Sequence, residues 1–322
     1  MSTDGDVTVR EISIDNPNTD TAVTIVQLTD LHLSGTLTSE DRKDGVIKYT
    51  YDNHLWGRDG QYTYRTEQAL AVAAKNADKI IITGDVIDYQ SQGSINLVKS
   101  VIWEEYSNVT LLMGNHEPLR TLDKINNPDT MPLADRLTVL EGWGTYSCEM
   151  VGTHVMAISL DNGSLYDEGV NGSKFNLSPA QIEQFENDLK TARENGYTVL
   201  LFYHVPLNTG NPNYSNVKPI ELELNENKVT AGDLNTYNVA GRNFYNDSEL
   251  VGRNSADETS ARVYDIITSN ADVIAAAFCG HRHCDFYTEI NAYTQDGAFK
   301  TIPQYTLAGT AYTPSVLRIT VN

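Results

Sequence analysis

Residues 79–88 read KIIITGDVID: a lysine, three isoleucines, then threonine, glycine and an aspartate-rich turn. Three consecutive β-branched apolar residues predict a strand buried on both faces, because a half-buried strand would alternate with polar residues. The strand is expected over 79–83, and the glycine then allows the chain to turn. Asp85 therefore follows the carboxyl end of a buried strand, and Asp88 lies three residues further on. Taken alone, such a segment is an ordinary turn.

Four other apolar segments end in the same way, each followed closely by aspartate, asparagine or histidine. They are 23–28 with Asp30 and His32, 109–113 with Asn115 and His116, 198–203 with His204, and 273–278 with His281 and His283. Open α/β sheets build their sites from polar residues just past the ends of strands. These motifs use five of the seven histidines. The other two are interpreted as a lid or surface side chain (His54) and a hairpin residue (His154).

Helices are expected between these strands. Apolar residues at helical spacing predict helices over 64–76 and 95–106. Ser178 as N-cap, with Pro179 after it, opens a helix that Gly196 ends. Ser255 and Glu258 form a second capping box, which opens a helix to about residue 269. The alternation of strands and helices predicts an α/β fold.

The remaining strands complete a single predicted domain over residues 1–322. A hairpin is expected over 146–160, and further strands over 301–307 and 316–321. Imperfect alternation over 7–14 predicts an edge strand within the N-terminal residues 1–20. The sequence has no repeat, no low-complexity tract and no linker that would divide it.

Two long stretches, 34–63 and 207–254, interrupt the alternation. Loops of this length are usually functional or disordered. Each follows a polar motif directly, so both are expected to lie over the site as lids. The first contains several aromatic residues, which could stack on a flat group of a substrate or pack within the insertion itself; both readings remain open.

The net charge of −20 restricts the partners of this chain. A nucleic-acid polymer is not expected, because binding its backbone needs clustered Lys and Arg. An anionic membrane surface is disfavoured for the same reason. The simpler interpretation of the charge is solubility, and the sequence carries no signal for an oligomeric state.

Targeting and redox signals are weak. No apolar run is long enough for a membrane span, and no signal peptide is recognisable at the N-terminus. Low lysine with much Asn, Thr and Tyr favours an exported bacterial protein whose signal has been removed; otherwise the chain would be cytoplasmic. The three cysteines (Cys148, Cys279 and Cys284) form no disulfide framework. Cys279 and Cys284 flank the last motif and could bind metal, but buried apolar roles are expected.

The polar motifs supply hard oxygen and borderline nitrogen donors in the number that two metal ions need. Within Asp30-x-His32, an extended backbone would place both side chains on one face. His281-x-His283 would do the same, and a twist could turn each ring towards a different ion. The mixed shell suits Mn²⁺, Fe²⁺, Zn²⁺ or Co²⁺, and the sequence does not choose between them.

In order and spacing these motifs resemble the calcineurin-like metallophosphoesterase superfamily, over roughly residues 22–320. The resemblance implies a four-layer αββα sandwich of two mixed β-sheets flanked by helices. It also implies that Asp85 bridges two ions. Asp30, His32 and His283 would complete the ligand set of the first ion. Asn115, His204 and His281 would complete that of the second. His116 would act on the substrate, with Asp88 orienting it by a hydrogen bond.

The reaction implied is attack on phosphorus by a hydroxide that bridges the two ions. This sequence lacks residues that are typical of some branches of the superfamily, and this narrows the range of expected activities. Purple acid phosphatases have a tyrosine where Asp88 stands, and phosphoprotein phosphatases have an arginine where Tyr89 stands. The sequence therefore predicts a phosphodiesterase or phosphatase acting on a small phosphate ester. The alternative is a surface binding protein for carbohydrate or polymer, with a structural metal site.

Overall fold

The structure is a computed structural model. It describes residues 2–16, 18, 21–34, 61–88, 92–119, 143, 146–163, 177–207, 223–224, 227–228, 258–283 and 285–322. The two predicted lid insertions and His54 lie almost wholly outside these ranges, so the position of the insertions over the site stays a prediction. Within the second insertion the structure describes only Leu207 and the two-residue strands β9 (Glu223–Leu224) and β10 (Asn227–Lys228). Cys284 also lies outside the described residues.

The first sheet has six strands in the order β1-β2-β14-β3-β4-β5. Their bounds are Ser2–Asp4 (β1), Val7–Ile14 (β2), Ser315–Val321 (β14), Val23–Leu28 (β3), Lys79–Ile82 (β4) and Val109–Leu111 (β5). β3, β4 and β5 are parallel, and β14 joins them antiparallel to β3.

The strand predicted over 7–14 is present as β2, but only part of it lies at the edge of the sheet. β14 pairs with β2 along Thr8–Ile14, whereas β1 covers only Val7–Val9 on the other side of β2. The reason is local. The chain turns back at Gly5, whose φ of 63° suits a tight turn, so that the three residues before the turn (β1) pair with the start of β2. Such a short strand gives no periodicity that a sequence pattern could show.

The second sheet also has six strands, in the order β12-β13-β11-β8-β7-β6. Their bounds are Phe286–Tyr293 (β12), Phe299–Thr306 (β13), Ile274–Cys279 (β11), Thr198–Tyr203 (β8), Val155–Leu160 (β7) and Tyr146–Val151 (β6). The central four strands are parallel, and antiparallel hairpins close both edges. β12 was not predicted, although Phe286, Ile290 and Ala292 alternate with more exposed residues along it.

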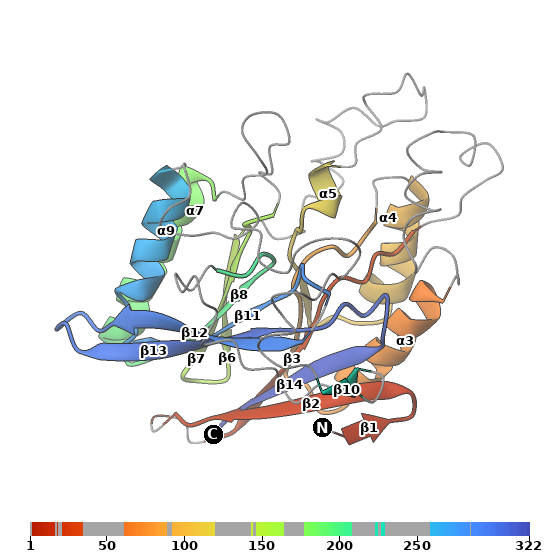
Figure 1. The fold of residues 1–322 in the computed structure, drawn as a ribbon, viewed down its shortest axis with the longest axis horizontal. Coiled ribbons are helices and arrows are strands. Elements are labelled where there is room, and N and C mark those ends of the chain that lie inside the picture. Colours follow the sequence, from red (N-terminus) through yellow and green to blue (C-terminus); the bar gives the residue numbers. More distant parts are fainter. Residues whose placement is uncertain are drawn as a thin grey trace.

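Helices cover the outer face of each sheet, as Figure 1 shows. The first sheet carries α3 (Tyr62–Ala73) and α4 (Gln92–Val98), the latter continued by a π-helical turn, η2 (Lys99–Trp103). The second sheet carries α7 (Pro179–Asn195) and α9 (Glu258–Thr268). A single turn, α5 (His116–Leu119), follows β5. The helix predicted over 95–106 therefore begins earlier, at Gln92, and it changes from an α-helix to a π-helix at Lys99.

Three buried clusters hold these layers together. One contains residues of both sheets, such as Ile25 and Ile81 from the first and Leu200 and Phe278 from the second, so the sheets pack face to face. Each of the others joins one sheet to its own helices. The predicted α/β, four-layer αββα arrangement is therefore confirmed, and burial of both faces explains the unbroken apolar runs in β4 and β8.

Both predicted ends of α7 are confirmed. The Ser178 side chain accepts a hydrogen bond from the Gln181 N–H at 3.2 Å, and Gly196 ends α7 with a φ of 70°. The predicted cap Ser255 lies outside the described residues. Among the helices that are described, none is long and apolar enough to cross a membrane.

Candidate metal centre

The polar motifs meet where the carboxyl ends of strands from both sheets come together. β3, β4 and β5 of the first sheet and β8 and β11 of the second each lead into one motif. In Figure 1, α5, which begins at His116, stands above the upper ends of these strands. The site thus spans the junction of the two sheets, and neither sheet holds all of it.

The first cluster contains Asp30, His32, Asp85 and His283, whose ligand atoms all lie within 4.8 Å of one another. Nε2 of His283 is 3.0 Å from Oδ1 of Asp30 and 3.0 Å from Nε2 of His32. Asp30 and His32 are completely buried. These side chains form one compact group of oxygen and nitrogen donors.

The second cluster contains Asp85, His204 and His281, again with ligand atoms within 4.8 Å. Oδ1 of Asn115 lies 3.1 Å from Nε2 of His204 and 2.9 Å from Nδ1 of His281. The amide oxygen therefore joins this group as a further donor. Buried carboxylate and amide oxygens together with imidazole nitrogens are the donors that first-row divalent cations prefer, so the chemistry of both clusters fits such ions.

Asp85 belongs to both clusters. Its Oδ2 lies 3.8 Å from Nε2 of His32 in the first, and its Oδ1 lies 3.3 Å from Nε2 of His204 in the second. One carboxylate therefore turns an oxygen towards each group. The structure brings together all seven predicted ligands, in the two sets that the family resemblance implies.

The backbone at these ligands differs from the extended conformation that was expected. Five of them have positive φ angles: Asp30 (51°), His32 (47°), Asp85 (48°), His281 (68°) and His283 (56°). This left-handed conformation is disfavoured for residues with a side chain and is found mainly where surrounding structure enforces it, often at functional sites. Hydrogen bonds enforce it here, because the Asp30 N–H donates to the Gly84 carbonyl and the His32 N–H to the Asp85 carbonyl.

His116 and Asp88 also lie together, as predicted from the motifs. Nδ1 of His116 is 2.9 Å from the backbone carbonyl oxygen of Asp88 and 3.1 Å from its Oδ1, and Nε2 of His116 is 3.8 Å from Oδ2 of Asp85. The imidazole therefore faces Asp88 with one nitrogen and the clusters with the other. Asp88 Oδ1 is also 3.1 Å from Nδ1 of His32, so one carboxylate oxygen contacts two histidines.

Burial and neighbouring charges shift the pKa values of three buried groups near the clusters, in different directions. Burial, helped by His116, lowers the pKa of His32 to about 4. Burial also acts to lower the pKa of His204, but Asp85 outweighs it and raises that pKa to about 9. Burial and the Asp85 charge raise the pKa of Glu117 to about 7. Divalent cations in the clusters would favour the charged form of that carboxyl.

These shifts predict how the stability of the metal-free protein depends on pH. The pKa of His204 is raised above its unfolded value, so its contribution is complete below about pH 6.5 and is lost as the pH rises through about 9. Glu117 acts in the same direction but at lower pH, because its contribution is complete below about pH 4.5 and is lost as the pH rises to about 7. We expect urea unfolding of EDTA-treated protein to show falling stability between about pH 6.5 and 9. His204→Asn should flatten this dependence, and an equal slope in the variant would contradict the assignment.

Asn162 is a site residue that the sequence patterns did not reveal. It follows β7, and its Oδ1 accepts hydrogen bonds from the N–H groups of His204 at 3.0 Å and Val205 at 2.9 Å. Its amide also donates to the Val205 carbonyl at 2.8 Å. The side chain thus holds the backbone that carries His204. A polar residue soon after an apolar strand is the available signal, but the pattern over 146–160 by itself predicts only a hairpin.

Glycines allow the motifs to approach one another. A Cβ at Gly280 would lie 1.8 Å from Oγ1 of Thr29, and one at Gly114 would lie 2.3 Å from Oδ1 of Asp85. Both distances are far below van der Waals contact. Any side chain at these positions would therefore push a ligand of one motif away from its neighbours.

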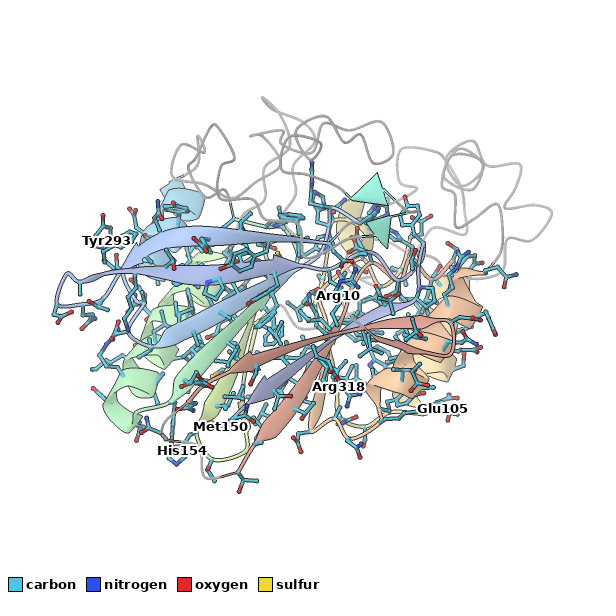
Figure 2. All side chains as sticks on the ribbon, turned by 60° about the horizontal axis from the view of Figure 1, so that its bottom comes forward. Arg10, Glu105, Met150, His154, Tyr293 and Arg318 are labelled. Atoms are coloured by element: carbon cyan, nitrogen blue, oxygen red, sulfur yellow. The ribbon has the colours of Figure 1, made fainter. Side chains whose placement is uncertain are left out.

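Two other residues that could bind metal, His154 and Cys279, lie outside both clusters. His154 occupies the turn between β6 and β7, at the lower edge of the molecule in Figure 2. Cys279 is buried and contacts Oγ1 of Thr306, and it belongs to neither cluster among the described residues. Burial raises the pKa of its thiol, which keeps it neutral. The expected apolar role of Cys279 agrees with this position.

Fold and site together define a class: an αββα sandwich with two adjoining carboxylate and imidazole clusters at its strand ends is the framework of a metal-dependent hydrolase. The sequence profile of the calcineurin-like phosphoesterases matches residues 23–285, and the chain belongs to that family. It is accordingly a metal-dependent hydrolase of phosphate esters.

Solved structures include several with similarity to this one. A dimetal phosphatase from Danio rerio (LOC 393393) is 14% identical and aligns over 91% of this chain and 89% of its own, with a TM-score of 0.52. PhoD aligns over 90% of this chain and 57% of its own, at 10% identity and a TM-score of 0.46. The phosphopantetheinyl hydrolase PptH from Mycobacterium tuberculosis covers 89% and 90%, at 11% identity and a TM-score of 0.38. The first of these supports the fold. No curated protein sequence matches the chain.

Proposed function

We propose that this protein is a small-molecule phosphodiesterase or phosphatase that works with two divalent ions of the Mn, Fe, Zn or Co type. The observation that carries the proposal is the placement of Asp85, which presents one oxygen to each cluster. When bound, paired ions would polarise the phosphoryl group and lower the pKa of an attacking water. Asp30, His32 and His283 would hold one ion, and Asn115, His204 and His281 the other.

The chain's own contribution to the reaction centres on His116. Its Nε2 faces the clusters, while its Nδ1 faces Asp88. We propose that Nε2 donates a proton to the leaving oxygen or stabilises charge on the phosphoryl group. Asp88 accepts the hydrogen bond from Nδ1–H and so fixes the orientation of the ring. A proton on Nε2 as well requires the imidazolium form, which the Asp88 carboxylate would stabilise. The Asp88 carboxylate, itself buried, restricts the rotation of the ring.

The proposed substrate is a small ester and not a nucleic-acid polymer. A net charge of −20 disfavours a long polyanion, which would need many cationic contacts. A single phosphate group is different, since bound cations can neutralise it locally. We propose that the insertions 34–63 and 207–254 select the group attached to the phosphate.

The alternative, a binding protein with a structural metal site, has less support. A structural site would need ligands, but it would not need a histidine that points one nitrogen at the clusters and the other at a buried carboxylate. The distance of 3.1 Å between His116 and Asp88 therefore favours a hydrolase.

The proposal predicts metal-dependent hydrolysis of simple phosphate esters. We expect the protein with added Mn²⁺ to hydrolyse p-nitrophenyl phosphate, bis-p-nitrophenyl phosphate or both, and EDTA to abolish the activity. Diester turnover would identify a phosphodiesterase, and turnover of the monoester alone would identify a phosphatase. Activity that survives complete removal of metal would refute the two-ion proposal.

A further inference from the structure

Glu117 is a buried carboxylate that has no part in the reaction proposed above. It follows His116 in α5 and has no exposed surface. Its Oε1 accepts hydrogen bonds from the N–H groups of Val86 at 2.7 Å and Ile87 at 3.1 Å. Its Oε2 accepts one from the Gly114 N–H at 2.6 Å. All of these partners are backbone groups.

The three N–H groups belong to two different metal-ligand loops. Val86 and Ile87 directly follow Asp85 after β4, whereas Gly114 directly precedes Asn115 after β5. In the described part of the chain, Glu117 forms no ion pair with Lys or Arg, so backbone N–H dipoles stabilise its charge. Hydrogen bonds to an ionised acceptor are short and strong. Glu117 therefore ties the backbone of one loop to that of the other.

We infer that Glu117 is a positioning residue that sets the separation of Asp85 and Asn115 and thereby the affinity of the second cluster for its ion. This inference rests on the proposed two-ion function. The first cluster takes Asp30, His32 and His283 from other loops, so it depends less on this link. The second takes Asn115 directly from the loop that Glu117 holds.

Substitution by glutamine tests the link because the two side chains have the same shape. One amide oxygen can replace Oε1 and still accept from Val86 and Ile87. The amide NH₂ then faces the Gly114 N–H, which leaves two donors in contact and one without an acceptor. Gly114 must shift, and Asn115 moves with it. The reversed amide is worse, because it opposes two N–H groups.

The experiment is a calorimetric titration of metal-free protein with Mn²⁺ at about pH 8, supported by the electron paramagnetic resonance signal of spin-coupled Mn²⁺ pairs. We expect wild type to bind two ions. In Glu117→Gln the dissociation constant of the second ion should rise about 10–100-fold, the usual effect of losing a residue that supports a ligand. The first ion should bind as before, and the coupled signal should disappear at stoichiometric metal. Glu183→Gln, an exposed change on α7, serves as the control.

A second variant separates the effect of the charge of Glu117 from the effect of its length. Glu117→Asp keeps the negative charge but is one methylene shorter, so it reaches only one of the two loops. We expect this variant also to lose affinity for the second ion selectively. Because it keeps the negative charge, such a loss could not be attributed to the charge. If Glu117→Gln does not fold, this variant decides the matter alone. A folded variant of either kind that binds both ions with wild-type affinity would overturn the inference, whereas fewer than two ions in wild type would instead contradict the proposed function.

Discussion

Replacing His116 with alanine should lower turnover about 10²–10⁴-fold, the range for loss of a positioned acid or base, while both metal clusters keep their ions. The structure separates these effects, because the His116 ring belongs to neither cluster that Asp85 joins. Its Nε2 approaches Asp85 only to 3.8 Å, whereas its Nδ1 faces Asp88 at 3.1 Å. The substitution therefore removes the proposed acid and leaves the proposed ligands in place.

The measurement is the turnover number for the better of the two p-nitrophenyl esters, together with metal content. His154→Ala is the matched control, since this histidine lies in the turn between β6 and β7, at the lower edge of the molecule in Figure 2 and at the end of β7 opposite to Asn162. We expect the control to retain wild-type turnover. Unchanged turnover in His116→Ala would remove this residue from the reaction. Loss of metal together with turnover would assign it a ligand role.

Replacing Asp85 with asparagine should have the larger effect on metal binding. An amide has only one oxygen, so it cannot present an oxygen to both His32 and His204, as the carboxylate does. The charge that balances two dications is lost as well. We expect fewer than two ions to remain bound. Turnover should fall on the order of 10³-fold, because paired ions supply several kcal/mol of transition-state stabilisation.

Elemental analysis and turnover of the same preparation check this result. The matched control is Asp296→Asn, which changes an exposed aspartate in the turn between β12 and β13. Thermal unfolding in EDTA shows whether the Asp85 variant still folds without metal. Two tightly bound ions in a folded Asp85→Asn protein would mean that this residue does not bridge the clusters.

Local sequence predicted the elements that depend on local physics. The isoleucine run gives β4 its unbroken burial, and Ser178 caps α7 with its side chain, both as expected. β12 was missed because its alternation is partial and polar Thr288 is among its buried positions. The pattern over 7–14 could not show that β1 covers the start of this strand, because β1 is only three residues long and gives no periodicity.

For the site, sequence determined which residues carry the chemistry, and it could do so because each motif directly follows an apolar strand. It could not determine the conformation of those residues. The left-handed backbone of Asp30 and His32 is disfavoured in isolation, and hydrogen bonds that their N–H groups donate to the Gly84 and Asp85 carbonyls hold it in the folded protein. The supporting role of Asn162 was equally hidden, because its partners lie more than forty residues along the chain.

The sequence by itself therefore determined the kinds of ligand, their order and the strands that deliver them. Tertiary structure alone decided how Asp85 divides its oxygens between two clusters and how Asp88 contacts both His32 and His116. The physical reason is that these contacts join loops that follow different strands, and the contact of Asp85 with His204 joins the two sheets. The distance across that contact depends on how the sheets pack through Ile25, Ile81 and Phe278, and no local pattern encodes that packing.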